Sequence, residues 1–262
     1  MKSIIDEMVA EIRAREMNVF SVTEILNGES RSVTIKEDTF CRNVYSVSKA
    51  FTMAAIGFLF DEGKIKPSDT VEDIFKKLPE GADERWYEVT VHDLLRHRTG
   101  LTESMDVDCA QTLEKAKDGW LEYIFRLRLN GIRGETCQYT DAVFYLLSRA
   151  VSALTGKTLC DYLREKLFLP LNFREFAWSS CPHGYSSGGS GLYISCQDMA
   201  KLGKLWLGGG VYNGKRLLSE EWVRAAVEND YAFSLRDEKY KGYYKTGAMG
   251  QILYFSPPRP RA

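Results

Sequence analysis

The sequence predicts an α+β fold in which strands from both ends of the chain form one layer and a mostly helical domain is inserted between them. Three observations lead to this prediction. β-Rich segments occur near the N-terminus, at residues 18–26 and 32–36. Strand character returns only at residues 242–247 and 251–255. The sequence between these ends is mainly helix and loop, without an internal repeat or a low-complexity tract.

The N-terminal part is expected to form an amphipathic helix followed by a β-hairpin. One face of the helix collects apolar side chains, namely Ile4, Ile5, Met8, Val9 and Ile12. The two β-rich segments that follow are separated by Asn27-Gly28. This dipeptide is typical of two-residue hairpin turns because both residues tolerate a positive φ.

A long apolar helix is predicted to start at or just before Ser46 and to run to Phe60, with Gly63 after its end. Apolar residues cover nearly its whole circumference, so we expect it to be central and buried. Ser46 and Lys49 are three residues apart and share a face of this helix. A helix N-terminus favours an alkoxide, and a desolvated lysine gives up its proton more easily. The pair is therefore typical of a serine nucleophile beside its base, although serine also begins many helices simply as a cap.

Further helices are expected in the central part of the chain, at residues 91–97, 113–128, 140–154, 159–166, 197–206 and 220–228. Glycines close several of them. Gly156 follows one helix, and residues 208–210 follow another before a probable turn at Asn213-Gly214.

Composition and charge argue against several classes of partner. The chain has 262 residues, of which 44% are hydrophobic and 27% are charged, and its formal net charge is −1. This balance gives no electrostatic reason to expect a nucleic-acid or anionic-membrane partner. No window is apolar for long enough to span a membrane, and acidic residues near the N-terminus interrupt any signal-peptide core. We therefore expect a cytoplasmic protein.

The spacing of cysteine and histidine does not indicate a metal site. The cysteines lie far apart, at positions 41, 109, 137, 160, 181 and 196, without a C-x-x-C pair. The histidines, at positions 92, 97 and 183, do not form an H-E-x-x-H arrangement. We expect reduced thiols, no structural metal and no cofactor.

Two more short motifs carry groups that serine hydrolysis needs. Tyr139-Thr140-Asp141 stands at the start of a predicted helix, and Lys245-Thr246-Gly247 stands on a predicted strand. A tyrosine can pass a proton to the leaving group, and a second cation can attract an anionic substrate. Each motif also has a structural explanation. Tyr139 and Asp141 suit a helix start, and Lys245 suits an exposed strand edge.

The ordered trio S-V-S-K, Y-T-D and K-T-G resembles the penicillin-recognising serine hydrolases, most closely their class C β-lactamase, D,D-peptidase and esterase branch. Three other segments are similar to segments of that branch: residues 94–101, 141–156 and 187–200. The resemblance extends from about residue 18 to about residue 257. Several matching segments in one order are far more specific than one motif.

The resemblance implies a β-lactamase/transpeptidase-like fold, an α/β sandwich with an antiparallel sheet plus a mostly helical domain. Residues 1–58 and 230–262 would form the sheet domain, and residues 59–229 the helical domain. The active site would lie in the cleft between them. His97 would be a domain-packing residue.

The resemblance also implies roles for individual residues. Ser46 would be the acylated nucleophile and Lys49 its general base. Tyr139 would pass a proton to the leaving atom and activate the deacylating water. The backbone N–H groups of Ser46 and Ala248 would form the oxyanion hole. The residues expected to contact substrate are Asp141, Lys245, Thr246 and Gly247.

The sequence departs from the family pattern in two places. The second motif usually ends in asparagine, whereas here it ends in Asp141. An ionised carboxylate beside Lys49 would favour the charged lysine and weaken it as a base, so we expect poor hydrolysis of ordinary β-lactams. The second departure is the proline-rich tail at residues 258–262, which cannot supply the apolar strand that follows in the family. We expect a truncated or frame-shifted product, or a homo-oligomer in which a second copy completes the sheet.

The sequence therefore predicts a serine hydrolase that acts through an acyl-enzyme on an amide, lactam or ester bond of a small molecule or short peptide. Carboxylesterase and D-amino-acid peptidase activities are alternatives on the same fold, because the motifs do not separate them. A catalytically impaired member that serves as a binding or scaffold protein is the alternative from another class.

Overall fold

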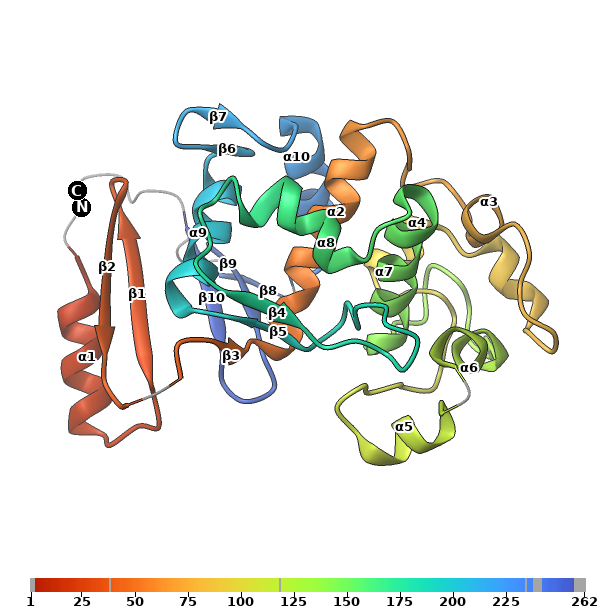
Figure 1. Cartoon of the computed structure of the whole chain (residues 1–262), viewed down its shortest axis with the longest axis horizontal. Helices are drawn as coiled ribbons and strands as arrows, with labels where there is room; N and C mark the ends of the chain where they lie inside the picture. The colour runs from red at the N-terminus through yellow and green to blue at the C-terminus, as the bar shows by residue number, and fades with distance from the viewer. Residues whose placement is uncertain (1–2, 38, 118, 234, 238–241, 257–262) are drawn as a thin grey trace.

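The computed structural model describes residues 3–256 except 38, 118, 234 and 238–241. The proline-rich tail at residues 258–262 lies outside the described residues. Helices and short strands surround one hydrophobic core, which confirms the predicted α+β class (Figure 1). In the described part of the chain, no helix has the length and apolar character needed to cross a membrane.

The N-terminal helix and hairpin form as predicted. Helix α1 (Ile5–Ala14) packs against strand β1 (Ser21–Leu26), which pairs antiparallel with β2 (Glu29–Thr34). Asn27 and Gly28 have φ values of 52° and 88°, the left-handed conformations that this hairpin turn requires. The predicted apolar face of α1 is wrong in part, because Ile4 and Met8 are exposed while Ile5, Val9 and Ile12 are buried.

Helix α2 (Ser48–Asp61) is the centre of the core, and a 3₁₀ turn, η1 (Tyr45–Val47), precedes it. It packs against α7 (Asp141–Thr155), α8 (Leu159–Leu163) and α10 (Glu220–Glu228). Gly57 allows the last of these contacts, because a Cβ there would lie 2.3 Å from the Trp222 indole nitrogen. The predicted central position of this helix is confirmed (Figure 1).

The predicted helix at residues 113–128 is wrong as a single element. It forms two helices, α5 (Ala110–Lys115) and α6 (Trp120–Arg126), with Gly119 between them at φ 151°. Glycine adopts this conformation readily, so the chain changes direction there. The predicted helix at residues 159–166 forms α8 followed by a π-helical turn, η3 (Arg164–Phe168). The remaining helical segments are α4 (Val91–Leu95), α9 (Cys196–Leu207), and two that the sequence did not predict, α3 (Val71–Phe75) and the 3₁₀ turn η2 (Glu84–Glu88).

The strands form several small antiparallel sheets. The C-terminal sheet has the order β10-β9-β8, from strands β8 (Leu235–Asp237), β9 (Gly242–Thr246) and β10 (Ile252–Phe255). Helix α9 packs against both β1 and β10 and so connects this sheet to the N-terminal hairpin. Within the described residues the hairpin and the three-stranded sheet are not hydrogen-bonded to each other.

Two further sheets use strands of only two or three residues. The sheet β3-β5-β4 joins β3 (Arg42–Asn43), β5 (Leu192–Ile194) and β4 (Phe176–Trp178), and β6 (Val211–Tyr212) pairs with β7 (Lys215–Arg216) across the expected turn at Asn213-Gly214. The pairing of β3 with β5 continues to Val44, just before η1 and α2, since the Val44 N–H donates to the Leu192 carbonyl at 2.8 Å. The domain boundaries at residues 58/59 and 229/230 remain a prediction.

Candidate active site

Ser46 and Lys49 lie together at the beginning of the central helix. Ser46 is half-buried in η1, and its preceding residue, Tyr45, has a φ of 47° and donates its N–H to the Asn43 side chain at 2.8 Å. Lys49 lies in the first turn of α2 with no exposed surface. Its Nζ is 3.2 Å from Ser46 Oγ. The structure therefore places the predicted hydroxyl and amine within hydrogen-bond reach.

The Lys49 amine has two more partners. It donates to Asp141 Oδ1 at 2.5 Å and to the Gly189 carbonyl at 2.8 Å. A lysine ammonium carries three N–H donors, and Ser46, Asp141 and Gly189 accept all three. These three contacts fix the position of the Lys49 amine beside Ser46.

Asp141 is the first residue of α7, where an acidic side chain suits the helix dipole. Thr140 caps this helix, and the segment at residues 105–107 fixes its start. The Met105 carbonyl accepts from the Asp141 N–H at 2.9 Å, and the Val107 N–H donates to Asp141 Oδ2 at 3.2 Å. Both carboxylate oxygens therefore have protein partners, and the expected carboxylate beside Lys49 is present.

Gly189 is a site residue that the sequence reasoning missed. A Cβ at this position would lie 2.5 Å from Asp141 Oδ1, so only glycine lets the backbone carbonyl approach the ion pair. Its neighbour Gly188 accepts a hydrogen bond from the Thr52 hydroxyl at 2.7 Å. The dense run of glycine and serine at residues 187–191 was the available signal, but short polar runs are also ordinary loops.

Tyr139 stands immediately before α7, with 46% of its surface exposed. Its ring centroid lies 4.7 Å from Lys49 Nζ and 4.9 Å from Lys245 Nζ. Cations near the face of an aromatic ring are attracted by its quadrupole. The ring of His97 lies on Tyr139 with a centroid distance of 4.5 Å. The two lysines and Tyr139, far apart in the sequence, therefore share one site.

Lys245 comes from strand β9 and is only 1% exposed, so the structural alternative of an exposed strand-edge lysine is wrong. Burial lowers the pKa of Lys245 to about 7, and the nearby Lys49 charge adds to this effect while Asp141 opposes it. The strand ends close to η1, because a Cβ on Gly247 would lie 2.6 Å from the Val44 carbonyl. Thr246 is exposed beside it, and Ala248 follows in the turn. The oxyanion role of Ala248 stays a prediction.

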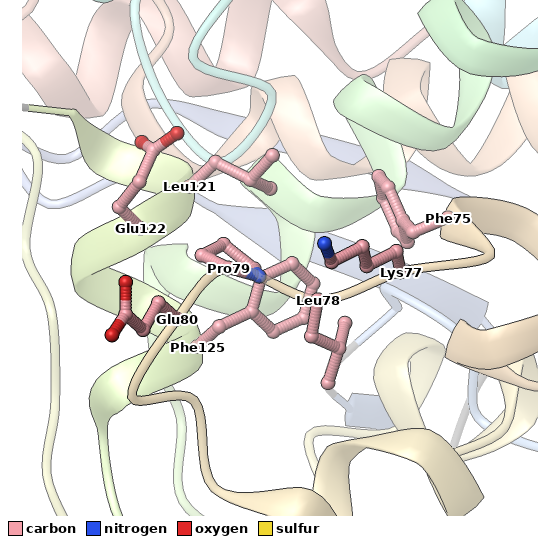
Figure 2. Close-up of a pocket in the computed structure, with 8 residues that line it drawn as sticks. All are labelled: Phe75, Lys77, Leu78, Pro79, Glu80, Leu121, Glu122 and Phe125. Carbon is pink, nitrogen blue, oxygen red and sulfur yellow. The ribbon is translucent and has the colours of Figure 1, made fainter.

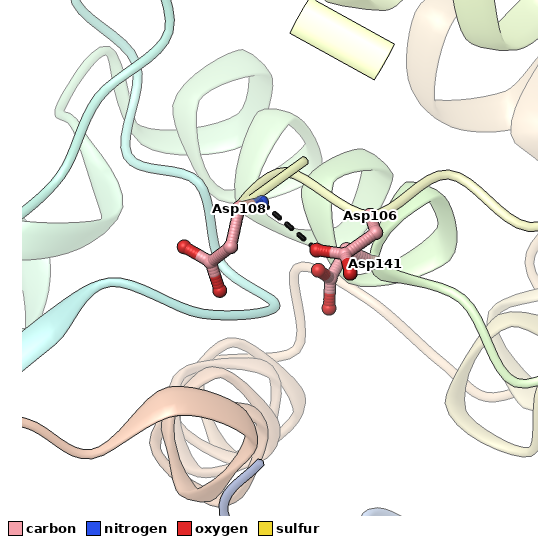
Figure 3. A group of neighbouring side chains, drawn as sticks. All are labelled: Asp106, Asp108 and Asp141. Atoms are coloured by element: carbon pink, nitrogen blue, oxygen red, sulfur yellow. Dashed lines mark hydrogen bonds between the residues drawn. The ribbon is translucent and has the colours of Figure 1, made fainter. Parts of the chain in front are cut away.

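Two further carboxylates lie close to Asp141 (Figure 3). Side-chain oxygens of Asp106, Asp108 and Asp141 all lie within 4.8 Å of one another. Asp106 Oδ1 accepts from the Asp108 N–H at 2.9 Å, and the Ser190 hydroxyl donates to Asp108 Oδ2 at 2.5 Å. Partial burial raises the pKa of Asp108, which the Ser190 hydrogen bond opposes. Lys49 and the Val107 N–H already bind the Asp141 oxygens. We therefore regard the three aspartates as an acidic side of the active site.

A separate pocket lies between the loop after α3 and helix α6 (Figure 2). Apolar side chains dominate its lining, with three charged residues among them: Phe75, Leu78, Pro79, Leu121, Phe125, Lys77, Glu80 and Glu122. None of the predicted catalytic or substrate-binding residues lines this pocket, so we do not connect it with the chemistry at Ser46.

Comparison with known proteins identifies several relatives. The chain is 27% identical over 219 residues to the 6-aminohexanoate-dimer hydrolase of Paenarthrobacter ureafaciens, and the alignment covers 78% of this chain and 55% of that protein. This chain thus spans only about half the length of that relative.

Solved structures show the same fold. A penicillin-binding protein homologue from Caulobacter crescentus superposes with a TM-score of 0.72 at 17% identity, covering 96% of this chain and 88% of that one. A D-stereospecific amidohydrolase from Streptomyces sp. superposes with a TM-score of 0.67 at 15% identity, covering 97% and 86%. The predicted β-lactamase/transpeptidase-like fold is confirmed. The family model described as Beta-lactamase matches residues 26–261, nearly the whole chain, and the chain therefore belongs to the Beta-lactamase family.

Proposed function

We propose that the chain is a serine hydrolase that forms an acyl-enzyme on Ser46 and cleaves an amide or lactam bond. The observation that carries this proposal is the 3.2 Å contact between Lys49 Nζ and Ser46 Oγ at the start of a buried helix. A helix N-terminus stabilises the alkoxide that attack requires. The family membership supports the same reaction class.

The reaction can be written with the residues of the site. Ser46 Oγ attacks the substrate carbonyl carbon and gives its proton to Lys49 in its neutral form. The C–N bond then breaks, and Tyr139, whose ring lies close to both lysines, passes a proton to the leaving nitrogen. Tyr139 next takes a proton from the water that attacks the acyl carbonyl, the bond to Ser46 Oγ breaks to release the carboxylic acid, and Lys49 returns its proton to Ser46 Oγ. Backbone N–H groups of Ser46 and Ala248 would hold the oxyanion.

The charge around Ser46 indicates the substrate. Asp106, Asp108 and Asp141 line one side of the site, so a substrate carboxylate there would meet like charge. Lys49 is already paired with Asp141 and offers little compensation. We therefore propose a neutral or amine-bearing amide in preference to a β-lactam, whose carboxylate is anionic. A relative named for the 6-aminohexanoate dimer and a neighbour named as an amidohydrolase are consistent with this choice.

A substrate panel tests the proposal. The purified protein is assayed on the linear 6-aminohexanoate dimer, a D-amino-acid amide, a p-nitrophenyl ester and a chromogenic cephalosporin, with Ser46→Ala as the matched control. We expect turnover of an amide and of the ester, weak turnover of the cephalosporin, and none by the control. Activity on the ester alone would support the carboxylesterase alternative. Equal activity of Ser46→Ala would exclude the acyl-enzyme.

A further inference from the structure

His97 follows α4 and holds the backbone on both sides of Tyr139. Its carbonyl oxygen accepts a hydrogen bond from the Gln138 N–H at 3.0 Å, and its Nδ1 accepts one from the Thr140 N–H at 3.4 Å. The backbone of His97 has a φ of 57°, in the left-handed region where histidine is enriched among non-glycine residues. One residue thus holds the backbone N–H groups of both sequence neighbours of Tyr139.

The His97 ring also supports the Tyr139 ring directly. The His97 and Tyr139 centroids are 4.5 Å apart with an interplanar angle of 38°. The His97 ring also contacts Phe144, whose centroid lies 5.1 Å from the His97 centroid. Tyr139 is 46% exposed, so protein contacts hold only part of its surface. The His97 ring, only 7% exposed, is a rigid support beneath it.

The protonation of His97 suits this position. Because Nδ1 accepts from the Thr140 N–H, the imidazole proton is on Nε2, which is buried and has no partner among the described residues. Burial lowers the pKa of His97 to about 2, and the charges of Lys49 and Lys245 act in the same direction. A neutral ring can lie beside two cations without charge repulsion, which a protonated histidine could not do.

We propose that His97 is a positioning residue for Tyr139, acting through the two backbone hydrogen bonds that flank Tyr139 and through the contact between the two rings. This inference rests on the proposed function, in which Tyr139 passes a proton to the leaving group. It assigns to His97 a role in the reaction beyond domain packing.

The leaving group separates a positioning role from a structural one. An amine must be protonated to leave, whereas p-nitrophenolate leaves without a proton. Misplacement of Tyr139 therefore slows acylation by the amide and spares acylation by the nitrophenyl ester, and kcat/KM reports the steps up to acylation. Displacement by about 1 Å costs roughly 100-fold in rate when geometry is critical. Loss of folded protein, by contrast, lowers both activities by the same factor.

Three substitutions divide the contributions of His97. His97→Ala removes the ring and the Nδ1 acceptor. His97→Asn tolerates the left-handed backbone and can accept from the Thr140 N–H, but it lacks the ring. His97→Phe keeps a ring and loses the acceptor. The exposed His183 provides the matched control, His183→Ala.

The experiment measures kcat and KM on an amide and on a p-nitrophenyl ester, together with crystal structures of the wild type and the variants. We expect His97→Ala to lower kcat/KM on the amide about 10-fold to 100-fold, to change kcat/KM on the ester less than about 3-fold, and to shift the Tyr139 ring. His97→Asn should recover part of the amide rate, and His183→Ala should match the wild type.

Parallel loss on both substrates, or an unmoved Tyr139 ring in both His97→Ala and His97→Asn, would overturn the positioning role. The crystallographic comparison keeps the inference distinct from the proposed function. A folded wild type that cleaves neither substrate and forms no fluorophosphonate adduct on Ser46 would contradict the proposed function alone. The position of the Tyr139 ring in the variants would still decide the role of His97.

Discussion

Two buried lysines face the ring of Tyr139, one from a helix and one from a strand, and the protein treats their charges differently. Lys49 on α2 donates to a hydroxyl, a carboxylate and a carbonyl, so its charge is compensated. Lys245 on β9 is equally buried, and burial together with the charge of Lys49 brings its pKa down to about 7. The Lys49 amine is therefore held by three protein acceptors, while the protonation of Lys245 changes near neutral pH.

Removal of the helix lysine should have the largest effect. Lys49→Met leaves the buried Asp141 carboxylate without its cation, which we expect to lower the free energy of unfolding by about 3 kcal/mol or more at pH 7. Ester kcat/KM should fall at least about 1000-fold with the base lost. Urea unfolding and steady-state kinetics measure both. Lys245→Met is the matched comparison and should lose much less stability, and equal losses would contradict the contrast between the two lysines.

Substitution of Gly189 should disturb the surroundings of Lys49, and substitution of Gly247 should disturb the end of strand β9. An alanine Cβ would lie 2.5 Å from Asp141 Oδ1 at position 189 and 2.6 Å from the Val44 carbonyl at position 247. Overpacking of this kind costs about 1–3 kcal/mol. We expect Gly189→Ala to lower kcat on the ester by roughly 100-fold by shifting the ion pair. Gly247→Ala should act mainly on KM, because we expect β9 to contact the substrate. The same kinetic change in both variants would argue against separate roles.

Replacement of the Asp141 carboxylate by an amide should make the surroundings of Lys49 more similar to the family pattern, in which this motif ends in asparagine. Asp141→Asn removes the negative charge that favours the charged form of Lys49 and repels anionic substrates. We expect a gain of about tenfold in kcat/KM on a chromogenic cephalosporin. Asp106→Asn, which leaves the Lys49 ion pair intact, is the control. No gain in Asp141→Asn would remove this explanation of poor β-lactam hydrolysis.

The smallest expected effect is a pH dependence that comes from Lys245. Its pKa is about 7 in the folded chain and 10.5 as the reference, so between these values the unfolded chain binds more protons. Stability should therefore rise with pH through this window, by about 1 kcal/mol per pH unit, and the penalty for burying the charge is complete below pH 7. Urea titrations at pH 7.0 and 9.0 should show this rise in the wild type. A rise of the same size in Lys245→Met would refute the assignment.

Local patterns in the sequence were sufficient to predict the helices and strands on which the site residues lie. The apolar run after Ser46, the Asn27-Gly28 turn and the ordered motifs each reflect short-range physics, and the helix, hairpin and strand formed where expected. The break at Gly119 was missed because one glycine inside a periodic segment is often tolerated.

The long-range parts of the site were not predictable in the same way. The Gly189 carbonyl meets Lys49 across 140 residues, and the Asp106 and Asp108 carboxylates come from a loop without a periodic signal. Strands β3, β4 and β5 are only two or three residues long, which is too short for an alternating pattern. His97 showed its backbone contacts with Gln138 and Thr140 only in the folded chain.

The central claim is that Ser46 is a nucleophile activated by Lys49. The most direct test is intact-protein mass spectrometry after exposure to a fluorophosphonate, followed by peptide mapping, with Ser46→Ala treated in parallel. A single covalent adduct on Ser46, absent from Ser46→Ala and strongly reduced in Lys49→Met, is the result we predict. Folded protein that takes no adduct, or that takes it on another residue, would contradict the claim.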